Sequence, residues 1–324
     1  MKIDKKCIYS IIENKAIETK GVIERFNLGL TWSSCKVFFQ GNENLGFAMS
    51  PQDKSRILQW PGTIAGQTVA SVAHNLRSWN NFDVTMALSA CNGAINSHHN
   101  LLLQEAELLP VEGNANVTVF NYFKPKLKNK KIVVVGRYPH LDSAMEGLDY
   151  TVLERQPQNG DLPDTAAEDL IPQADWVFIT SSSLINKTFP RLSELAKNAV
   201  TVLMGPTTPW LAEFVAFDVD FLAGVKVTDG KMAEQIAMEG GGTRLFEGGV
   251  RYALANLSAS RLKGLKKEIA KVAEARSVLK RDMDAWYQKG QAGRFSHFAE
   301  LEAADLRLSQ LDTAYKRLWD ANRG

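Results

Sequence analysis

The chain has 324 residues, of which 45% are hydrophobic and 23% are charged, and this length allows two or three domains with cores of their own. A formal net charge of +2 gives no electrostatic argument for a nucleic acid or a membrane surface as partner. No apolar run approaches the length that crosses a bilayer, and the first residues lack the apolar core of a secretion signal. We therefore expect a cytoplasmic protein that binds neither nucleic acid nor membrane.

The cysteines Cys7, Cys35 and Cys91 are widely spaced along the chain. Their odd number argues against a disulfide framework. No CxxC motif or Cys/His cluster gives a closed zinc site. We expect three reduced, partly buried thiols.

Residues 1–114 have the mixed pattern of an α+β domain. Gly41-Asn42 is a turn signal between two strand-like runs. Gly62-Thr63 and Asn81 are plausible helix starts, because small polar residues satisfy the free amides of a first turn. The expected elements are a helix over 5–20, strands over 27–39 and 44–49, and helices over 63–78 and 82–96.

Residues 115–256 alternate short apolar strands with helical patterns. The run Ile132-Val133-Val134-Val135 is apolar at every position, as expected for a strand that helices cover on both faces. Strands that alternate with helices predict a parallel sheet with right-handed crossovers, a Rossmann-like α/β domain. The expected strands lie at 131–135, 149–154, 176–180, 200–204 and 221–225.

Residues 257–324 change to helical periodicity. Apolar residues recur at a three-four spacing on both sides of the segment Gly290-Gln291-Ala292-Gly293. Two helices of roughly 30 and 25 residues are therefore expected to form an antiparallel, coiled-coil hairpin. Its remaining aromatic residues are expected to meet a second subunit, another protein or the body of the chain, so a homo-oligomer or protein partner through residues 258–324 is predicted. These residues are Trp286, Phe295, Phe298 and Trp319.

Polar groups follow each strand of the Rossmann-like domain. In an open parallel sheet the ligand crevice lies outside the carboxyl ends of the strands, so groups that follow five strands in register predict a polar crevice there. They are Gly136, Arg137, Tyr138, Pro139 and His140; Glu154 and Arg155 with the turn at 159–164; Thr180, Ser181, Ser182 and Ser183; Gly205, Pro206, Thr207, Thr208 and Pro209; and Gly224, Thr228 and Asp229.

Glu154 is the most informative single residue, because it ends the second expected strand 18 positions after Gly136. In dinucleotide-binding and related folds an acidic residue about 20 positions beyond the first glycine turn binds ribose hydroxyls. The alternative is a structural carboxylate paired with Arg155 or with a loop amide. The other glycines of the dinucleotide fingerprint are absent, so a full NAD-type binding mode is not expected.

Several other residues are candidates for chemistry. The run Gly240-Gly241-Gly242-Thr243 is either an anion-binding nest or a flexible connection. His98-His99 is more typical of an exposed helix end than of a metal pair, since adjacent helical residues point about 100° apart. General acid–base work could fall to five residues. These are Glu154, Asp161, Asp164, Asp229 and His140, of which Glu154, Asp229 and His140 are the catalytic candidates that we retain.

Several motifs in order resemble the heavy-metal-chelation family, whose Rossmann-like domain follows a smaller domain similar to the enolase N-terminal fold. In the larger domain the motifs are VVVGRYPHL (133–141), LERQPQNGDLPDTAAEDLIPQADWVFIT (153–180), INKT (185–188), GPTTP (205–209), LAGVKVTD (222–229) and EGGGTRLFEGG (239–249). In the smaller domain they are TIAGQ (63–67) and MALSACNGAIN (86–96). The resemblance covers about residues 1–256 and leaves the last 68 or so outside.

The resemblance implies a ligand site in the cleft between the two domains. Its implied ligand-binding residues are Gly136, Tyr138, Glu154, Thr180, Asn186, Thr188, Pro206, Thr207, Thr208, Asp229, Gly241 and Gly242, faced by Asn92 and Asn96. Cys91 and His140 are the metal-ligand candidates. Because the strand-end loops are rich in oxygen, and soft heavy metals prefer thiolate and imidazole, we expect a metal chelate rather than a naked ion.

Three functions stay open from the sequence. The first is binding or processing of a metal chelate or a small molecule related to a metal cofactor. The second is an enzyme that uses an adenosyl-type ligand, S-adenosylmethionine or a nucleotide. The third is an interaction module that acts through the C-terminal hairpin. The first two require that Glu154, Asn186 and Thr208 converge on one pocket rim.

Overall fold

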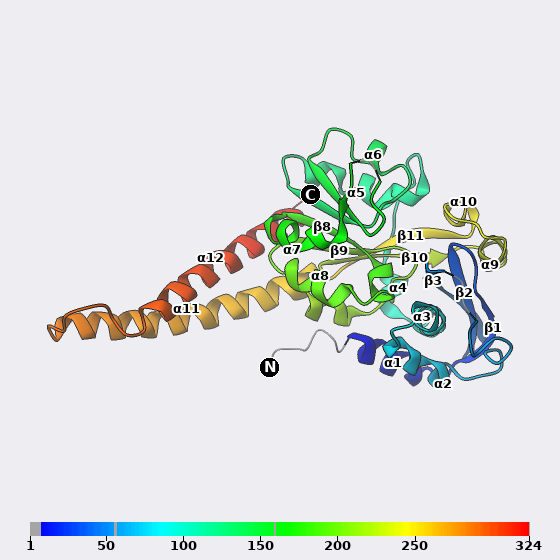
Figure 1. The fold of residues 1–324 in the computed structure, drawn as a ribbon, viewed down its shortest axis with the longest axis horizontal. Coiled ribbons are helices and arrows are strands. Elements are labelled where there is room, and N and C mark those ends of the chain that lie inside the picture. Colours follow the sequence, from blue (N-terminus) through cyan, green and yellow to red (C-terminus); the bar gives the residue numbers. More distant parts are fainter. Residues whose placement is uncertain (1–7, 55–56, 159, 324) are drawn as a thin grey trace.

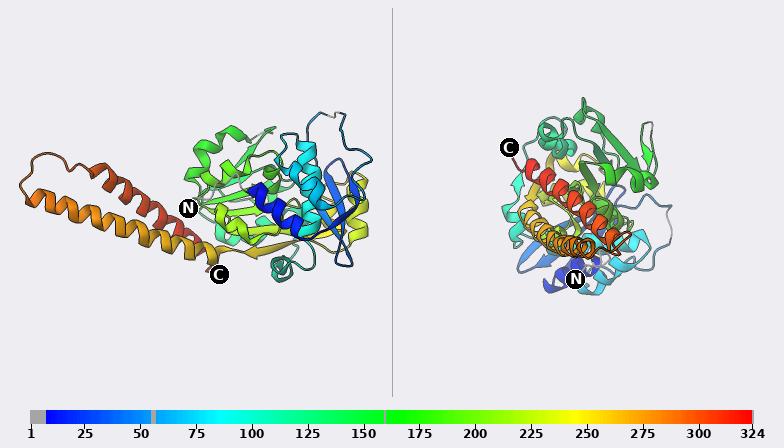
Figure 2. Two further views of the ribbon diagram at one scale, coloured as in Figure 1. Left: turned by 90° about the horizontal axis from the view of Figure 1, so that it is seen from below. Right: turned by 90° about the vertical axis from the view of Figure 1, so that its left-hand side faces the viewer.

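The computed structural model describes residues 8–54, 57–158 and 160–323. An eight-stranded sheet forms the centre of the body, a three-stranded sheet with its helices packs beside it, and two long helices leave the body as an arm (Figure 1). The view from below shows the same separation of body and arm (Figure 2, left). The expected α/β class, with a smaller α+β part and a C-terminal helical hairpin, is confirmed.

The three-stranded sheet is an antiparallel meander of β1 (Val22–Asn27), β2 (Trp32–Phe39) and β3 (Asn42–Met49). Gln40 and Gly41 form the two-residue turn between β2 and β3, with φ of 48° and 81°. Two positive φ values are what a type I′ hairpin turn requires. The predicted hairpin is thus confirmed, whereas β1 was not expected because charged residues interrupt its apolar pattern.

Helix α3 (Asn81–Ile95) covers one face of this sheet. The side chain of Asn80 caps it by accepting a hydrogen bond from the Phe82 amide at 3.1 Å. A Cβ atom on Gly46 of β3 would lie 2.0 Å from the backbone nitrogen of Gly93. Helix and strand therefore touch backbone to backbone, a packing that only glycine allows.

The helix expected over 63–78 is wrong over its first half. Gly62 and Gly66 have φ of 82° and 85°, which an α-helix cannot include. The chain becomes helical only at α2 (Val69–Ala73), where the Thr68 hydroxyl accepts a hydrogen bond from Ser71 N. Helix α1 (Ile8–Glu18) lies within the expected range of 5–20, of which residues 5–7 fall outside the described part of the chain.

The eight-stranded sheet has the order β4-β11-β10-β9-β8-β5-β6-β7. The six strands from β10 to β7 run parallel, and β11 pairs antiparallel with both β10 and β4. All five expected strands are present, and the antiparallel β11 was missed. The bounds are β4 (Glu107–Leu108), β5 (Ile132–Val135), β6 (Tyr150–Glu154), β7 (Leu162–Pro163), β8 (Trp176–Thr180), β9 (Val200–Met204), β10 (Phe221–Val227) and β11 (Val250–Asn256).

Both faces of this sheet are covered. Val133 and Val135 join the apolar core that also contains α1 to α3. Ile132 and Val134 face the other side of the sheet and join a second apolar core, which also contains residues of the arm. This alternation explains why every residue of the strand is apolar. The remaining helices are α4 (Leu101–Glu105), α5 (Thr118–Leu127), α6 (Leu141–Ala144), α7 (Ala167–Leu170), α8 (Phe189–Leu195), α9 (Gly230–Met238) and α10 (Leu245–Gly248), with 3₁₀ turns η2 (His74–Arg77), η3 (Ala115–Val117), η4 (Asp164–Ala166), η5 (Ile171–Gln173), η6 (Ser181–Leu184) and η7 (Ala212–Phe217).

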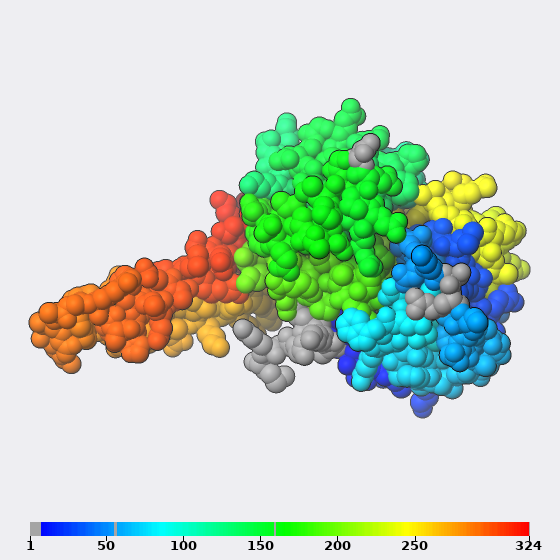
Figure 3. All heavy atoms as spheres, viewed as in Figure 1, coloured from blue at the N-terminus to red at the C-terminus, as the bar shows by residue number. Residues whose placement is uncertain are grey.

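The arm consists of α11 (Ser258–Gln288) and α12 (Phe298–Ala321), which lie side by side and project from the body (Figure 3). The 31 residues of α11 correspond to a rod about 46 Å long. Trp286 and Phe295 contact each other near the tip, with ring centroids 6.3 Å apart. Contact of the arm with a second subunit stays a prediction. No helix of the described residues is both long and apolar enough to span a membrane.

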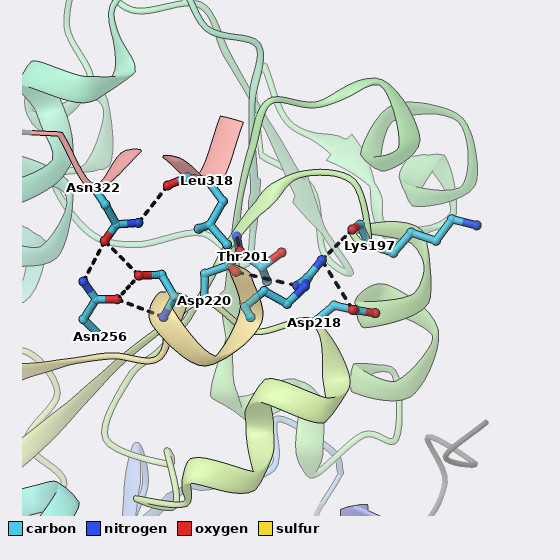
Figure 4. A network of polar contacts seen from close by, with 9 residues as sticks. Lys197, Thr201, Asp218, Asp220, Asn256, Leu318 and Asn322 are labelled. Atoms are coloured by element: carbon cyan, nitrogen blue, oxygen red, sulfur yellow. Dashed lines mark hydrogen bonds and ion pairs between the residues drawn. The ribbon is translucent and has the colours of Figure 1, made fainter. Parts of the chain in front are cut away.

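The root of the arm is fixed to the amino-terminal edge of the sheet by a network of polar contacts (Figure 4). Arg261 of α11 is only 7% exposed and lies 3.4 Å from Asp218 and 3.6 Å from Asp220. Asn256 donates a hydrogen bond to Asn322 at 2.8 Å and so joins the beginning of α11 to the end of α12. These contacts hold both helices at the edge of the sheet opposite the strand ends expected to bind ligand.

Candidate functional site

The loops that follow the parallel strands meet at one edge of the sheet. Gly136 has φ of +95°, and a Cβ atom there would lie 3.0 Å from Thr180 Cγ2. Gly205 has φ of +119°, and its Cβ would lie 3.0 Å from Ser181 Oγ. Glycine therefore lets neighbouring loops approach at this edge. The structure brings Gly136 and Thr180 together, and their role as ligand contacts stays a prediction.

Glu154 caps its own loop. One carboxylate oxygen accepts a hydrogen bond from Arg137 N at 2.8 Å, and the other accepts from Arg155 N at 2.7 Å and from Gln156 N at 3.3 Å. A carboxylate that accepts three backbone amides has a structural role that does not depend on ligand. This geometry matches the structural alternative that the sequence left open and does not test ribose binding.

The other acidic candidates near Glu154 are also paired. The Asp161 side chain accepts hydrogen bonds from Arg137 Nη1 and from Gln158 N, both at 3.0 Å. Asp164 lies 3.8 Å from Arg155 on the surface. Both carboxylates therefore stabilise the loops after β6.

Tyr138 and His140 occupy different environments in the loop after β5. The Tyr138 ring packs edge-on against Phe120 at 5.3 Å. Its hydroxyl oxygen is buried and has no hydrogen-bond partner among the described residues, and burial raises the pKa of this phenol. His140 is exposed and has φ of 65° at the start of α6. The role of either residue in ligand or metal binding stays a prediction.

The loop after β8 is ordered by short-range hydrogen bonds. Thr180 Oγ1 and Ser182 Oγ lie 3.0 Å apart. Asn186 Oδ1 accepts a hydrogen bond from Thr188 N at 3.2 Å and another from Thr188 Oγ1 at 2.7 Å. Asn186 and Thr188, predicted to share a site, thus contact each other directly.

Lys187, between these two residues, was not singled out from the sequence. It has a left-handed φ of 66°, its ammonium lies 3.9 Å from the centroid of the Tyr9 ring, and it donates a hydrogen bond to the Leu76 carbonyl. Burial lowers its pKa to about 8. Lys187 thus joins the loop after β8 to the N-terminal helices, and no local pattern announces that long-range contact.

The loop after β9 is held by asparagines of the smaller domain. Asn92 Nδ2 donates to the Thr207 carbonyl at 2.9 Å, and Asn96 Nδ2 donates to the Thr208 carbonyl at 3.1 Å. Thr207 and Thr208 are each 1% exposed. Thr207 Oγ1 accepts a hydrogen bond from Met49 N, and Thr208 Oγ1 donates to the Gly205 carbonyl. Asn92 and Asn96 face this loop and donate their amide hydrogens to it, while Asn92 Oδ1 is buried and has no hydrogen-bond partner among the described residues.

The glycine run after α9 docks a loop of the smaller domain. Gly241 N donates to the Ile236 carbonyl at 2.8 Å and so helps to close the end of α9. The Gly242 carbonyl accepts a hydrogen bond from Trp32 Nε1 at 3.0 Å. Leu30 fills the space where a side chain on Gly240 would lie, 2.8 Å from its Cβ position. The Gly241 amide is therefore occupied, which argues against the anion-nest interpretation.

A hollow of about 710 Å³ lies where β2, β3 and the end of α3 meet β10 and the start of α9. We call it the lysine hollow, after Lys36, Lys226 and Lys231 in its wall. Four residues that the sequence predicts to face the site line it, namely Asn96, Pro206, Thr228 and Asp229. The polar lining residues are Lys36, Glu43, Asn44, Asn96, His98, Gln104, Lys226, Thr228, Asp229 and Lys231, and the remaining ones include Pro206.

The charges of the lysine hollow are unequally neutralised. Lys36 lies 3.0 Å from Glu234 and 3.3 Å from Glu43, and the hydrogen bond to Glu234 raises its pKa. Lys226 instead donates to two backbone carbonyls, and burial lowers its pKa. Lys231 is exposed at the start of α9. The hollow therefore offers positive charge that carboxylates do not fully compensate.

Asp229 gives the hollow a negative group at the start of α9. Its Oδ1 accepts a hydrogen bond from Met232 N at 2.9 Å, which caps the helix. Asp229 is itself exposed. One carboxylate oxygen is thus occupied by the helix, and its role in catalysis or binding stays a prediction.

The described residues do not fit a heavy-metal ion held by protein side chains. Among them, no group of three or more His, Cys, Asp or Glu residues is placed to hold a metal. Cys91 is fully buried in the apolar core, as is Cys35, and burial raises the pKa of both thiols. Cys91 is therefore a poor ligand candidate, because metal binding needs an accessible thiolate. Cys7 lies outside the described residues.

The expected convergence of Glu154, Asn186 and Thr208 on one pocket rim is not seen in the described hollows. None of the three lines the lysine hollow, and Thr208 is turned inward. The structure instead collects Asn96, Pro206 and Asp229 there. The three lysines of the hollow were missed because they lie on β2, β10 and α9, and no sequence spacing connects those elements.

Two family models match the chain, over residues 9–95 and 118–256, and both carry the description "Putative heavy-metal chelation". Together they cover more than half of the chain. The arm lies beyond residue 256, where the second match ends.

Solved structures share this fold. A protein of unknown function from Desulfitobacterium hafniense superposes with a TM-score of 0.65 at 25% identity, covering 78% of this chain and 98% of that one. A second protein of unknown function, from Pyrococcus horikoshii, gives a TM-score of 0.64 at 22% identity, covering 76% and 99%. Both proteins belong to the DUF364 family.

A curated relative, an uncharacterized protein from Methanocaldococcus jannaschii, is 33% identical over 127 residues. The match covers 37% of this chain and 49% of the relative, so it spans about half of the relative's length.

Proposed function

Because the chain belongs to the heavy-metal-chelation family, we propose that it binds or processes a metal chelate, or a small molecule related to a metal cofactor, in the lysine hollow. The hollow lies between the smaller domain and the Rossmann-like domain, where the resemblance implies a ligand. One observation carries the proposal: lysines and amides line the wall, while its Glu43, His98 and Asp229 side chains form no metal-holding group among the described residues.

The size of the hollow suits a small organic molecule. Its volume of about 710 Å³ lies within the range of roughly 300–1,000 Å³ that ligand pockets occupy. A hydrated ion alone would fill only a small part of this space. A chelate, which brings its own ligands and its own outer surface, fits better.

The charge of the hollow favours an anionic ligand. Lys226 and Lys231 have no carboxylate within ion-pair distance among the described residues. Helix α9 also begins at this hollow, and the amino terminus of a helix attracts negative charge. Polycarboxylate chelators and their metal complexes carry such charge on oxygen atoms that lysine and amide groups bind.

Calorimetric titration with the Ni²⁺ complex of nitrilotriacetate tests the proposal. We expect this chelate to bind, and Lys231→Gln to weaken it about fivefold to tenfold, since a partly solvated charge contact contributes about 1 kcal/mol. Lys263→Gln on the exposed face of α11 is the matched control and should bind as wild type. Equal affinity for wild type and Lys231→Gln, or no heat at millimolar chelate, contradicts the proposal.

Asp229→Asn distinguishes a chelate from a bare ion. Asparagine caps a helix as well as aspartate does, so α9 should stay intact. We expect the anionic chelate to bind this variant more tightly than wild type, because a negative charge has left the hollow. If Ni²⁺ alone binds wild type as tightly as the complex does, and Asp229→Asn abolishes it, the metal is held by protein side chains and the chelate account is wrong.

A further inference from the structure

A second hollow adjoins the lysine hollow at Thr228, which lines both. It has a volume of about 530 Å³ and lies between η3, α10 and the start of β11. We call it the arginine hollow, after Arg251 in its wall. Of the residues singled out from the sequence, Thr228 and Thr243 line it, whereas Arg251 was not predicted.

Arg251 reaches the hollow with part of its hydrogen-bonding capacity unused. One guanidinium nitrogen, Nη2, donates to the Leu109 carbonyl at 2.9 Å. Its Nε is buried and has no hydrogen-bond partner among the described residues. A buried donor left unsatisfied costs about 1–3 kcal/mol. No carboxylate of the described residues lies within ion-pair distance of this guanidinium.

Lys226 adds a second positive charge beside Arg251. The two residues are direct partners in the antiparallel ladder of β10 and β11, so their side chains leave the same face of the sheet. Lys226 Nζ donates to the carbonyls of Gln104 and Ala106. Like charges opposite each other on a ladder are destabilising. Arg251 and Lys226 thus donate only to backbone carbonyls and have no acidic partner among the described residues. Together they give this part of the sheet a positive electrostatic potential.

The remaining polar walls suit an oxyanion, with one exception. Thr228 and Thr243 contribute hydroxyls, and Asn116, which is 5% exposed, contributes an amide that also donates to the Pro139 carbonyl at 2.6 Å. Glu247 is the opposing charge in the lining. Its carboxylate lies 3.6 Å from Arg244 Nε, which partly neutralises it.

We propose that the arginine hollow binds an oxyanion, the phosphate or carboxylate group of a small molecule, through the Arg251 guanidinium. The planar fork of arginine matches two oxygens of such a group, and Lys226 strengthens the field without reaching across. This site is separate from the function proposed for the lysine hollow and stands whether or not a chelate binds there.

Titration of the full chain with inorganic phosphate and, separately, with acetate, a carboxylate that is not a polydentate chelator, tests this site. We expect at least one of them to bind wild type and Lys231→Gln alike, and to bind Arg251→Lys about tenfold more weakly, because lysine keeps the charge and loses the fork. Arg251→Gln should abolish the binding. The tighter of the two anions identifies the oxyanion as phosphate or carboxylate. No heat from either anion at about 10 mM would overturn the proposal.

If the Arg251 variants fail to fold, a variant of Glu247 still measures whether an anion binds in the arginine hollow. Glu247 is exposed, so Glu247→Gln should fold as wild type. Removing the opposing charge should tighten binding about threefold to tenfold, and added salt should reduce the gain. Glu302→Gln, which removes an exposed carboxylate from the arm, should change nothing. Equal affinity of Glu247→Gln and wild type, or an equal gain in Glu302→Gln, would refute a site at this hollow.

Discussion

The two edges of the large sheet carry similar polar residues and use them differently. At the amino-terminal edge, Arg261, Asp220 and Asn322 join the arm to the body and are buried or paired (Figure 4). At the carboxyl-terminal edge, Lys231 and Asp229 are exposed at the wall of a hollow. Residue type therefore does not distinguish a structural joint from a binding site, whereas accessible charge does.

Glu154 combines features of the structural and the accessible polar groups. It is at the carboxyl-terminal edge, where a ligand is expected, yet three backbone amides occupy its oxygens. The loops after β5, β6 and β8 thus resemble the arm root more than they resemble the lysine hollow. The following predictions test this division between structural and accessible groups, beginning with the largest effect.

Arg261→Ala should have the largest effect on stability. Its removal leaves the buried Asp220 carboxylate without the cation that lies 3.6 Å away, and loss of one partner of a buried pair costs about 3–5 kcal/mol. Urea denaturation should show this loss of unfolding free energy. Arg276→Ala, at an exposed pair with Asp305, should cost less than about 1 kcal/mol. Equal losses in the two variants would mean that the arm root is not a buried joint.

The stability of the arm root should depend on pH through Asp220. Burial raises the pKa of this carboxyl to about 6, so between about pH 4 and 6 the folded chain binds more protons than the unfolded chain. Its contribution is therefore present at low pH and is lost as the pH rises through about 6, by on the order of 3 kcal/mol.

The comparison of wild type with Asp220→Asn isolates this effect. The difference between their unfolding free energies should change between about pH 4 and 6 and stay constant above about pH 7. Asparagine can still accept the hydrogen bond that Thr201 N donates at 2.9 Å. A pH-independent difference would show that Asp220 titrates normally.

Glu154→Ala should lower the unfolding free energy by about 1–3 kcal/mol, because three backbone amides lose their acceptor. Binding of the nitrilotriacetate complex in the lysine hollow should be unchanged. Calorimetry of the variant with S-adenosylmethionine and ATP addresses the adenosyl alternative. If either compound binds wild type and fails to bind Glu154→Ala, Glu154 is a ligand-binding residue rather than a purely structural one.

Lys187 should produce the smallest effect, at alkaline pH. Burial lowers its pKa to about 8, so between about pH 8 and 10.5 the folded chain binds fewer protons than the unfolded chain. Stability should then rise with pH, by less than about 1 kcal/mol, since the side chain is only partly buried. Lys187→Met should remove the rise and Lys263→Met should keep it. A rise that persists in Lys187→Met would assign it to another group.

The fold could be predicted largely because its strands are apolar throughout. Strands β8 and β9 begin and end where the runs 176–180 and 200–204 predicted. Strand β11 escaped prediction, because Val250–Asn256 carries an arginine and an asparagine and lacks a uniform apolar pattern. The helix expected over 63–78 begins only at Val69, because Gly66 adopts a positive φ.

The candidate site could be predicted only in part. Pro206 and Asp229, which were chosen because they follow strand ends, line one hollow, and their role in binding stays a prediction. Position after a strand end could not show that Thr208 turns inward or that Glu154 caps its own loop, since both depend on side-chain direction. Nor could it find Lys36, which comes to the hollow from a strand of the smaller domain.

Anomalous diffraction from crystals grown with the Ni²⁺–nitrilotriacetate complex tests the central claim most directly. We predict one strong nickel peak inside the lysine hollow, beside Lys231 and at the start of α9, with nitrilotriacetate oxygens between the metal and the protein. Nickel bound directly to histidine or carboxylate side chains, or a chelate bound near Glu154 with the lysine hollow empty, would contradict it.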